Sequence, residues 1–356
     1  MFGSVGYCYT ELVNKHVNKR VSYHLESPIR VTHCKSYLEE RGILQKCIYI
    51  PYSPISEALL LKVHDQSYLD ILKSFTDDQK SFVFENESTV DYRYTYVCKD
   101  TYDASLTAAS CLVTLSDQVL AGKVKHGIAL CRPPNHHAEK NLATGFCFLN
   151  GIAMMAENAL AKGRQRILIL DWDIHHGNGI QKHFYRRNDV LYISFHRYDH
   201  GEYYPGLKIG NFDAIGEGRG KHFNINIAWN DEKMTNGDYK YGFDQIVEPV
   251  MNQYQPDLVI IASGFDAMEN DPLGEYHLTP SIYSYMINKI KDIGKTNILI
   301  SLEGGYSKDN IAAGMAACIE SLQDNVLPDT NWNEPNAKCL QTINQVKRAH
   351  NEYWNF

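Results

Sequence analysis

The chain has 356 residues, of which 44% are hydrophobic and 22% are charged, and its formal net charge at pH 7 is −7. This size allows a large core in one or two domains, and the negative charge argues against a general nucleic-acid-binding surface, which needs a positive field. The nine cysteines are odd in number and scattered without a CxxC pair, which argues for a reducing compartment and against a disulfide scaffold.

The N-terminal stretch 1–20 has no continuous apolar run of the kind that a Sec-type signal peptide needs. No stretch of the chain approaches the ~20 consecutive apolar residues of a transmembrane helix. We therefore expect a cytoplasmic protein without membrane contact, and a nuclear location or export by a non-Sec route stays open.

Short apolar runs alternate with helix-like segments along the chain. The runs predict strands at 125–130, 166–170, 190–195, 222–228, 257–262 and 297–302, and helices are predicted at 148–163, 239–254 and 280–294. Strands that are hydrophobic on both faces suit a parallel sheet covered by helices. The alternation predicts a doubly wound α/β fold, in one compact domain over 1–325, with an extension over 326–356 that packs on it or trails from it.

Polar residues follow five of these strands, where the carboxyl ends of a parallel sheet meet. The sequences there are CRPPNHHAE, DWDIHHGNG, HRYDHGEYYPG, SGFDAMENDP and EGGY. Binding and catalytic sites of open α/β sheets form in the crevice beyond these strand ends. We expect the five segments to converge on one site.

The segment DWDIHHGNG offers metal ligands. Asp173 and His175 are two residues apart, so in extended backbone they share a face and can reach one ion. Mixed Asp and His ligation with an open position is typical of catalytic zinc. An isolated aspartate at a strand end most often caps a turn. Here the neighbouring Asp171 and the second histidine of the segment favour a metal site instead.

Two further segments complete the candidate site. Asp266 follows the strand at 257–262, where a third ligand would arrive, although an aspartate there could equally be a helix N-cap. His136 and His137 suit general acid–base chemistry near neutral pH; their candidate partners are Asp171 and Asn178, and the alternative is a pair of surface histidines.

The last segments supply a phenol and an apolar wall. Gly304 and Gly305 allow unusual backbone angles that could aim Tyr306 into the crevice, where its hydroxyl could donate to an oxyanion. Phe146 and Phe148 could line a slot for a linear, apolar substrate arm. Core packing is the alternative for these aromatic residues. Together the residues indicate metal-assisted hydrolysis of a carbonyl compound.

The motifs RPPNHHAE, GFCFLN, DWDIHHGNG, SFHRYDHGEYYPG, GFDAMENDPLG and LEGGY together resemble the zinc-dependent histone deacetylases, and DWDIHHGNG and SFHRYDHG resemble the class II members. The resemblance extends over roughly 320 residues in the family's order. It implies a three-layer arginase-like α/β fold with an eight-stranded parallel sheet, and a hydroxamate-sensitive hydrolase that removes acetyl groups from lysine side chains of proteins or peptides.

The resemblance also implies the site residues. One Zn²⁺ would bind Asp173, His175 and Asp266; His136 with Asp171 and His137 with Asn178 would be catalytic, with His137 as general base and acid and Tyr306 as the oxyanion donor. One structural K⁺ would be bound by Asp171, Asp173, His175, Ser194 and Phe195, and a second by Phe184, Val190 and Phe223. The substrate channel would be lined by Gly145, Phe146, Tyr204 and Leu273.

Two departures from the family pattern bear on the substrate. Tyr204 stands where the family has phenylalanine, which adds a hydroxyl near the mouth of the channel. Leu273 stands where polyamine-specific relatives have glutamate, which favours acetyl-lysine, although Glu275 could partly restore that charge. The family's rim aspartate has no clear counterpart; Asp91, in the stretch 85–98, is the candidate.

Other functions remain as alternatives. The first is deacetylation of a small amine such as an acetylpolyamine. The second is an arginase-like site with two Mn²⁺ ions, and the third is a protein that binds acylated chains without turnover.

Overall fold

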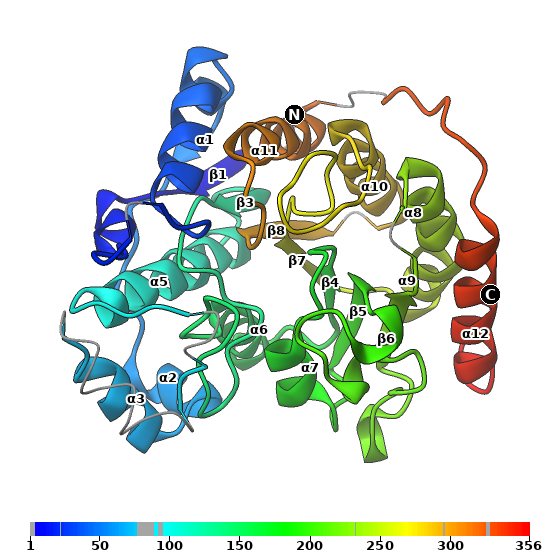
Figure 1. Ribbon diagram of the computed structural model, residues 1–356, viewed down its shortest axis with the longest axis horizontal. Helices are drawn as coiled ribbons and strands as arrows, with labels where there is room; N and C mark the ends of the chain where they lie inside the picture. Colours follow the sequence, from blue (N-terminus) through cyan, green and yellow to red (C-terminus); the bar gives the residue numbers. More distant parts are fainter. Residues whose placement is uncertain are drawn as a thin grey trace.

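The computed structural model describes residues 4–21, 23–76, 89–91, 95–231, 233–294, 296–324 and 328–356. These residues form one eight-stranded parallel sheet in the order β2-β1-β3-β8-β7-β4-β5-β6 (Figure 1). The strands are β1 (Val5–Cys8), β2 (Ile48–Tyr49), β3 (His126–Ala129), β4 (Ile167–Asp171), β5 (Val190–Arg197), β6 (Asn224–Trp229), β7 (Leu258–Ser263) and β8 (Asn297–Leu302).

Helices cover both faces of the sheet (Figure 1). One face is covered by α1 (Ile29–Glu40), α8 (Asn236–Gly242), α9 (Glu248–Tyr254), α10 (Pro280–Ile293), α11 (Lys308–Gln323) and α12 (Ala337–His350). The other is covered by α2 (Glu57–Val63), α3 (Gln66–Lys73), α5 (Thr101–Leu120), α6 (Gly151–Ala161) and α7 (Asn178–Phe184). Short 3₁₀ segments are η1 (Glu11–Lys15), η2 (Leu44–Lys46), η3 (Asp199–Gly201), η4 (Lys208–Gly210) and η5 (Gly218–Gly220).

Two hydrophobic cores explain why the central strands are apolar along their whole length. In β4, Leu168 and Leu170 face the core under α10 and α11, whereas Ile167 and Ile169 face the core under α5 and α6. Successive side chains of a strand point to opposite faces, so a sheet with helices on both sides needs an apolar residue at every position. The predicted three-layer α/β fold is confirmed.

All six predicted strands are present, and the structure adds two at the edge of the sheet. β1 is four residues long and contains Gly6, and β2 has only two residues, both exposed. Short strands with little apolar pattern give no clear periodic signal. Only the resemblance to a known family implied the full number of strands.

The predicted helix at 239–254 is helical, but it is not a single α-helix. It begins earlier, at Asn236, and a π-helical segment, η6 (Phe243–Val247), separates α8 from α9. Pro249 lies in the first turn of α9 and has no backbone N–H, so the regular α-helical hydrogen bond is lost there.

The C-terminal helix α12 packs against β6, and Cys339, Ile343 and Val346 join the core on that face. The side chain of Trp354 donates a hydrogen bond to the carbonyl of His222 (2.8 Å). The predicted boundary at residues 325 and 326 lies outside the described residues, so the division into a catalytic domain and an extension stays a prediction. Among the described residues, no helix has the length and apolar character to cross a membrane.

Candidate functional site

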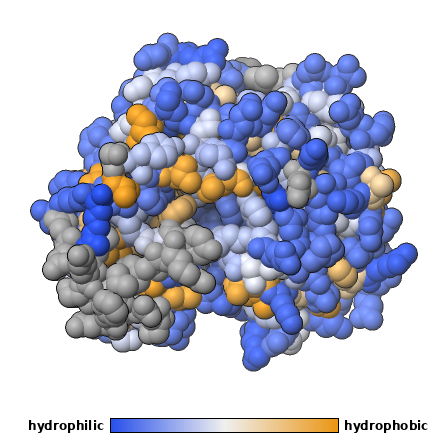
Figure 2. Space-filling model, viewed as in Figure 1, coloured by the Kyte–Doolittle hydropathy of each residue, from blue (hydrophilic) through white to orange (hydrophobic). Residues whose placement is uncertain are grey.

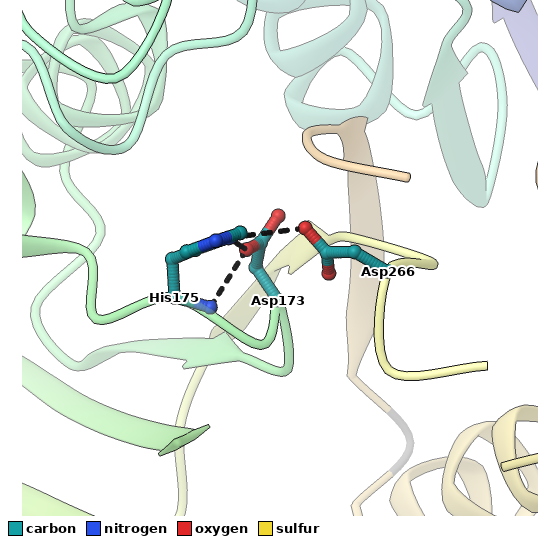
Figure 3. A group of neighbouring side chains, drawn as sticks. All are labelled: Asp173, His175 and Asp266. Atoms are coloured by element: carbon teal, nitrogen blue, oxygen red, sulfur yellow. Dashed lines mark hydrogen bonds and ion pairs between the residues drawn. The ribbon is translucent and has the colours of Figure 1, made fainter. Parts of the chain in front are cut away.

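Three buried ligand groups meet at the carboxyl ends of two neighbouring strands. Asp173 and His175 follow β4, and Asp266 follows β7. His175 Nδ1 lies 3.0 Å from Asp173 Oδ1 and 3.1 Å from Asp266 Oδ2 (Figure 3). One ligand atom from each residue lies within 4.8 Å of the others, and the three side chains form a group that could hold a metal ion.

The electrostatics of this cluster favour a cation. Burial raises the pKa of Asp266, and the neighbouring charge of Asp173 raises it further. Burial alone would lower the pKa of His175, but its bonds to Asp173 and Asp266 outweigh that effect and raise it to about 9. The two carboxylates thus draw positive charge to the place between them, and one His and two carboxylates with space beside them form a donor set that fits a catalytic divalent ion.

Glycine backbone packs closely around the two carboxylates. A Cβ on Gly264 would overlap the carboxylate of Asp173, and one on Gly304 would overlap that of Asp266. The backbone N–H of Gly304 donates to Asp173 Oδ2 (2.6 Å), and that of Ile174 donates to Asp266 Oδ1 (2.9 Å). These contacts hold both carboxylates in place, and no residue larger than glycine would fit at positions 264 and 304.

The tandem histidines lie beside the cluster with different partners. His136 Nδ1 is 3.1 Å from Asp171 Oδ2, and His137 Nδ1 is 2.8 Å from Asn178 Oδ1. Burial would lower the pKa of His136, but the charges of Asp173 and Asp171 raise it to about 10. Burial, together with the positive charges of His136 and His175, holds the pKa of His137 well below its usual value. One ring is therefore a cation and the other a neutral base.

Glu303 holds the backbone of the histidine segment, and the sequence analysis did not assign it a role. Its carboxylate accepts hydrogen bonds from the backbone N–H of Asn135 (2.6 Å) and of His136 (3.0 Å), and from the hydroxyl of Ser301 (2.6 Å). The sequence did contain a signal for Glu303, because a charged residue directly follows the predicted strand at 297–302. The other site residues were found by the same position, just beyond the end of a strand.

Tyr306 follows β8 and faces the pocket beside the cluster. Gly305 has φ of +109°, a conformation that favours glycine. The backbone N–H groups of Tyr306 (2.7 Å) and Ser307 (3.1 Å) both donate to Asp271 Oδ2. Asp271 Oδ1 also accepts a hydrogen bond from Leu273 N (3.0 Å), so the same carboxylate closes its own turn and holds the backbone at Tyr306.

A cavity of about 180 Å³ leads to the cluster and is lined by His137, Gly145, Phe146, His175, Tyr203, Tyr204, Leu273 and Tyr306. Gly145, Phe146, Tyr204 and Leu273, which were expected in the channel, all lie in this lining, whereas Phe148 packs in the core, the alternative considered for it. Tyr203 was not expected there; its ring stacks on His175 with centroids 5.3 Å apart, and its hydroxyl donates to the carbonyl of Leu273 (2.7 Å). Figure 2 shows a largely hydrophilic face with small apolar groups and a hollow near its centre.

Two polar side chains considered for the mouth of the channel, Tyr204 and Glu275, make contacts with distant parts of the chain. The hydroxyl of Tyr204 lies 2.6 Å from Thr144 Oγ1. The carboxylate of Glu275 pairs with Arg197 Nη1 at 2.8 Å, and the guanidinium lies over the Tyr203 ring. Glu275 is paired in this way and is not in the pocket lining, and its partial restoration of a charge at the channel stays a prediction.

The structure gives the positions of the rim candidate and of the expected potassium ligands, but no contact that establishes their roles. Asp91 Oδ2 accepts a hydrogen bond from Thr144 Oγ1 (3.4 Å), next to the pocket wall. Residues 85–88 and 92–94 of the stretch 85–98 lie outside the described part of the chain. Asp171 and Ser194 are direct partners across β4 and β5, and Phe195 follows. The second expected set, Phe184, Val190 and Phe223, is buried. Cation binding at both places stays a prediction.

Comparison with known proteins gives one consistent family. A family model described as the histone deacetylase domain matches residues 24–322. Histone deacetylase HDA1 of Candida albicans is 34% identical, over 98% of this chain and 44% of its own length. Polyamine deacetylase HDAC10 of Mus musculus is 35% identical, over 93% of this chain and 50% of its own. The crystal structure of the HDA15 HD domain superposes with a TM-score of 0.90 at 33% identity, covering 99% of this chain and 95% of that one. The chain spans about half the length of the curated relatives it matches.

Proposed function

This chain belongs to the histone deacetylase family, with HDA1-type proteins among its relatives, and from that membership we propose that it is a zinc-dependent hydrolase of the amide in N6-acetyl-lysine side chains of proteins, releasing acetate. The observation that carries the proposal is the buried Asp173–His175–Asp266 cluster at the base of an apolar pocket that also holds His137 and Tyr306.

Asp173, His175 and Asp266 would hold one Zn²⁺, since one imidazole and two carboxylates are ligands that zinc accepts. When bound, the ion supplies a Lewis acid for the acetyl carbonyl and lowers the pKa of water. Asp171, Asp173, His175, Ser194 and Phe195 are the proposed ligands of a structural K⁺, and Phe184, Val190 and Phe223 belong to a second proposed K⁺ site.

His137 is the proposed proton carrier. Its Nδ1 is held by Asn178, so Nε2 is the nitrogen left for the substrate. The low pKa of this ring keeps it neutral and able to accept a proton from the attacking water. The same nitrogen then returns the proton to the leaving lysine amine, while the cationic His136 beside Asp171 supplies positive charge to the site.

Tyr306 is the proposed oxyanion donor. Its hydroxyl donates a hydrogen bond to the carbonyl oxygen as that oxygen gains negative charge during attack. Burial holds the pKa of Tyr306 well above its usual value, so the hydroxyl keeps its proton. Phe146, with its ring 5.9 Å from that of Tyr306, and Tyr204 form walls for the methylene chain of the lysine.

The pocket lining favours acetyl-lysine over an acetylpolyamine. A polyamine carries a second ammonium group that needs a carboxylate near the mouth, and the residues that line the cavity include none. Leu273 lies in the lining, Glu275 is paired with Arg197, and the Asp91 carboxylate beside the pocket wall accepts a hydrogen bond from Thr144. Acetylpolyamines remain the alternative substrate, because proteins named polyamine deacetylases are among the relatives.

A direct turnover assay tests this proposal. The zinc-loaded protein should hydrolyse an acetyl-lysine peptide, and a hydroxamate should block that reaction. N8-acetylspermidine and N-acetylputrescine, assayed beside it, should react at least about tenfold more slowly in kcat/KM, a difference of ~1.4 kcal/mol. Turnover of the polyamines alone would replace the proposed substrate by the alternative, and turnover of neither would remove the deacetylase assignment.

Leu273→Glu should shift the substrate preference. A carboxylate at this position of the pocket attracts the distal ammonium of an acetylpolyamine, and we expect the ratio of kcat/KM for N8-acetylspermidine to that for a neutral acetyl-lysine peptide to rise about tenfold, or ~1.4 kcal/mol. Leu273→Gln has nearly the same shape without the charge and is the matched control. An equal shift in both variants would show that size, and not charge at position 273, sets the preference.

A further inference from the structure

A chain of hydrogen bonds leads from the pocket histidine His137 towards the surface. His137 Nδ1 lies 2.8 Å from Asn178 Oδ1, Asn178 Nδ2 lies 2.7 Å from Glu139 Oε1, and Lys182 Nζ lies 2.6 Å from the same Glu139 oxygen. We propose that Glu139 is a positioning residue that fixes the orientation of the Asn178 amide and thereby the tautomer of His137. The inference deepens the proposed function and rests on it only in taking His137 as the base.

The first step is the orientation of Asn178. Its Nδ2 faces the Glu139 carboxylate and also the backbone carbonyl of His137 at 3.4 Å. Both neighbours only accept hydrogen bonds. A turned amide would place its oxygen against these two acceptors and lose both bonds, so the NH₂ group must face them and Oδ1 must face His137.

The second step passes this orientation to the imidazole. An amide oxygen accepts and cannot donate, so the hydrogen of the neutral His137 ring must be on Nδ1. Nε2 then carries the free lone pair, and this is the nitrogen not occupied by Asn178. The opposite tautomer would put a hydrogen on the nitrogen that has to accept the proton, and it would not act as a base.

Glu139 is itself held in place by its surroundings. Its carboxylate is 13% exposed and pairs with Lys182 of α7, and its backbone N–H donates to Leu142 O (2.9 Å). The preceding carbonyl, Ala138 O, accepts from Asn150 Nδ2 (3.0 Å) and packs so closely on Gly179 that a Cβ there would overlap it. The segment 136–139 and the start of α7 are therefore held in a fixed geometry. This geometry keeps Glu139 Oε1 within hydrogen-bond distance of Asn178 Nδ2.

Glu139→Gln tests the proposal because glutamine keeps the shape but can donate. It is made together with Lys182→Met and compared with Lys182→Met alone, because the Lys182 ammonium would otherwise hold the glutamine oxygen towards Asn178. The new amide can offer its NH₂ to Asn178 Oδ1, which lets the asparagine present its own NH₂ to His137 Nδ1 and favours the hydrogen on Nε2. We expect kcat for the acetyl-lysine peptide to fall by about 10²-fold, within the range that general acid–base groups contribute, with little change in KM. The ¹⁵N spectrum of the His137 ring, assigned by its loss in His137→Ala, should show the protonated nitrogen move from Nδ1 to Nε2.

Glu157→Gln is the matched control. Glu157 is 11% exposed and binds His183 and Arg187, at the C-terminal end of α7 and just beyond it, but it has no bond to Asn178. This substitution should leave kcat and the His137 spectrum unchanged. In an Asn178→Ala background Glu139→Gln should have no further effect on kcat, because no amide remains to be oriented; a purely structural role for Glu139 would lower activity in both backgrounds.

The spectrum separates this inference from the proposed function. If the wild-type protein hydrolyses no acetylated amine, the proposed function fails, yet the ring hydrogen still reports whether Glu139 sets the tautomer. An unchanged Nδ1–H signal in Glu139→Gln overturns the inference whatever the activity. Should this variant fail to fold, Glu139→Ala also removes the acceptor and is read in the same way.

Discussion

Asp266→Asn will weaken zinc binding by roughly 10²–10⁴-fold and abolish turnover at limiting zinc. Removing one charge from a buried set costs about 3–5 kcal/mol, which corresponds to that loss of affinity. Asparagine keeps the size of the side chain and can still accept the hydrogen bond from Ile174 N, so the fold should be retained. Zinc affinity, measured by competition with a chelator, and kcat/KM at limiting zinc are the two readouts.

Thermal melting gives an independent measure of the same change. Zinc should raise the Tm of the wild-type protein, because a ligand that binds only the folded state stabilises it, and this rise should be absent in Asp266→Asn. Without metal the variant should melt no lower than the wild type, since one of two neighbouring buried carboxylates is neutralised. Asp309→Asn, at an exposed carboxylate outside the site, is the control. An undiminished rise in Tm would mean that Asp266 is not a ligand.

Tyr306→Phe should lower kcat for the acetyl-lysine peptide by about 10²–10³-fold, the usual effect of losing an oxyanion donor. The ring should keep its place, because Asp271 binds the backbone of Tyr306 and the Arg30 guanidinium lies 5.3 Å from the ring centroid. KM and zinc affinity should therefore change little. The experiment compares steady-state kinetics and zinc affinity of the variant with those of the wild type.

Tyr285→Phe is the matched control for this variant. The Tyr285 hydroxyl binds Asp244 at 2.6 Å and lies outside the pocket lining, so its removal should leave kcat unchanged. If Tyr306→Phe kept a kcat within a few-fold of the wild type, the oxyanion would have another donor and the role of Tyr306 would be refuted. A loss of zinc affinity would point instead to a disturbed cluster.

The amino-acid sequence by itself determined the architecture and the chemical groups of the site. The apolar runs that predicted β3 to β8 span five to seven residues each, and helices cover both faces of the sheet, so the apolar pattern of each strand is a local property of the sequence. The polar residues follow those runs directly, and the geometry of a parallel sheet brings its strand ends together. Asp173, His175 and Asp266 could be placed at one site for this reason.

Only the tertiary structure decided which acceptor each polar group meets. Glu303 binds backbone groups 168 and 167 residues away, and Asp271 binds the backbone of Tyr306 35 residues away. The pairing of Glu275 with Arg197 and of Tyr204 with Thr144 likewise joins distant segments. A hydrogen bond depends on positions within a few tenths of an ångström, and the packing of separate loops sets those positions. These positions cannot be read from the local sequence. The residue types of this site could therefore be predicted, but the hydrogen bonds that orient their side chains could not.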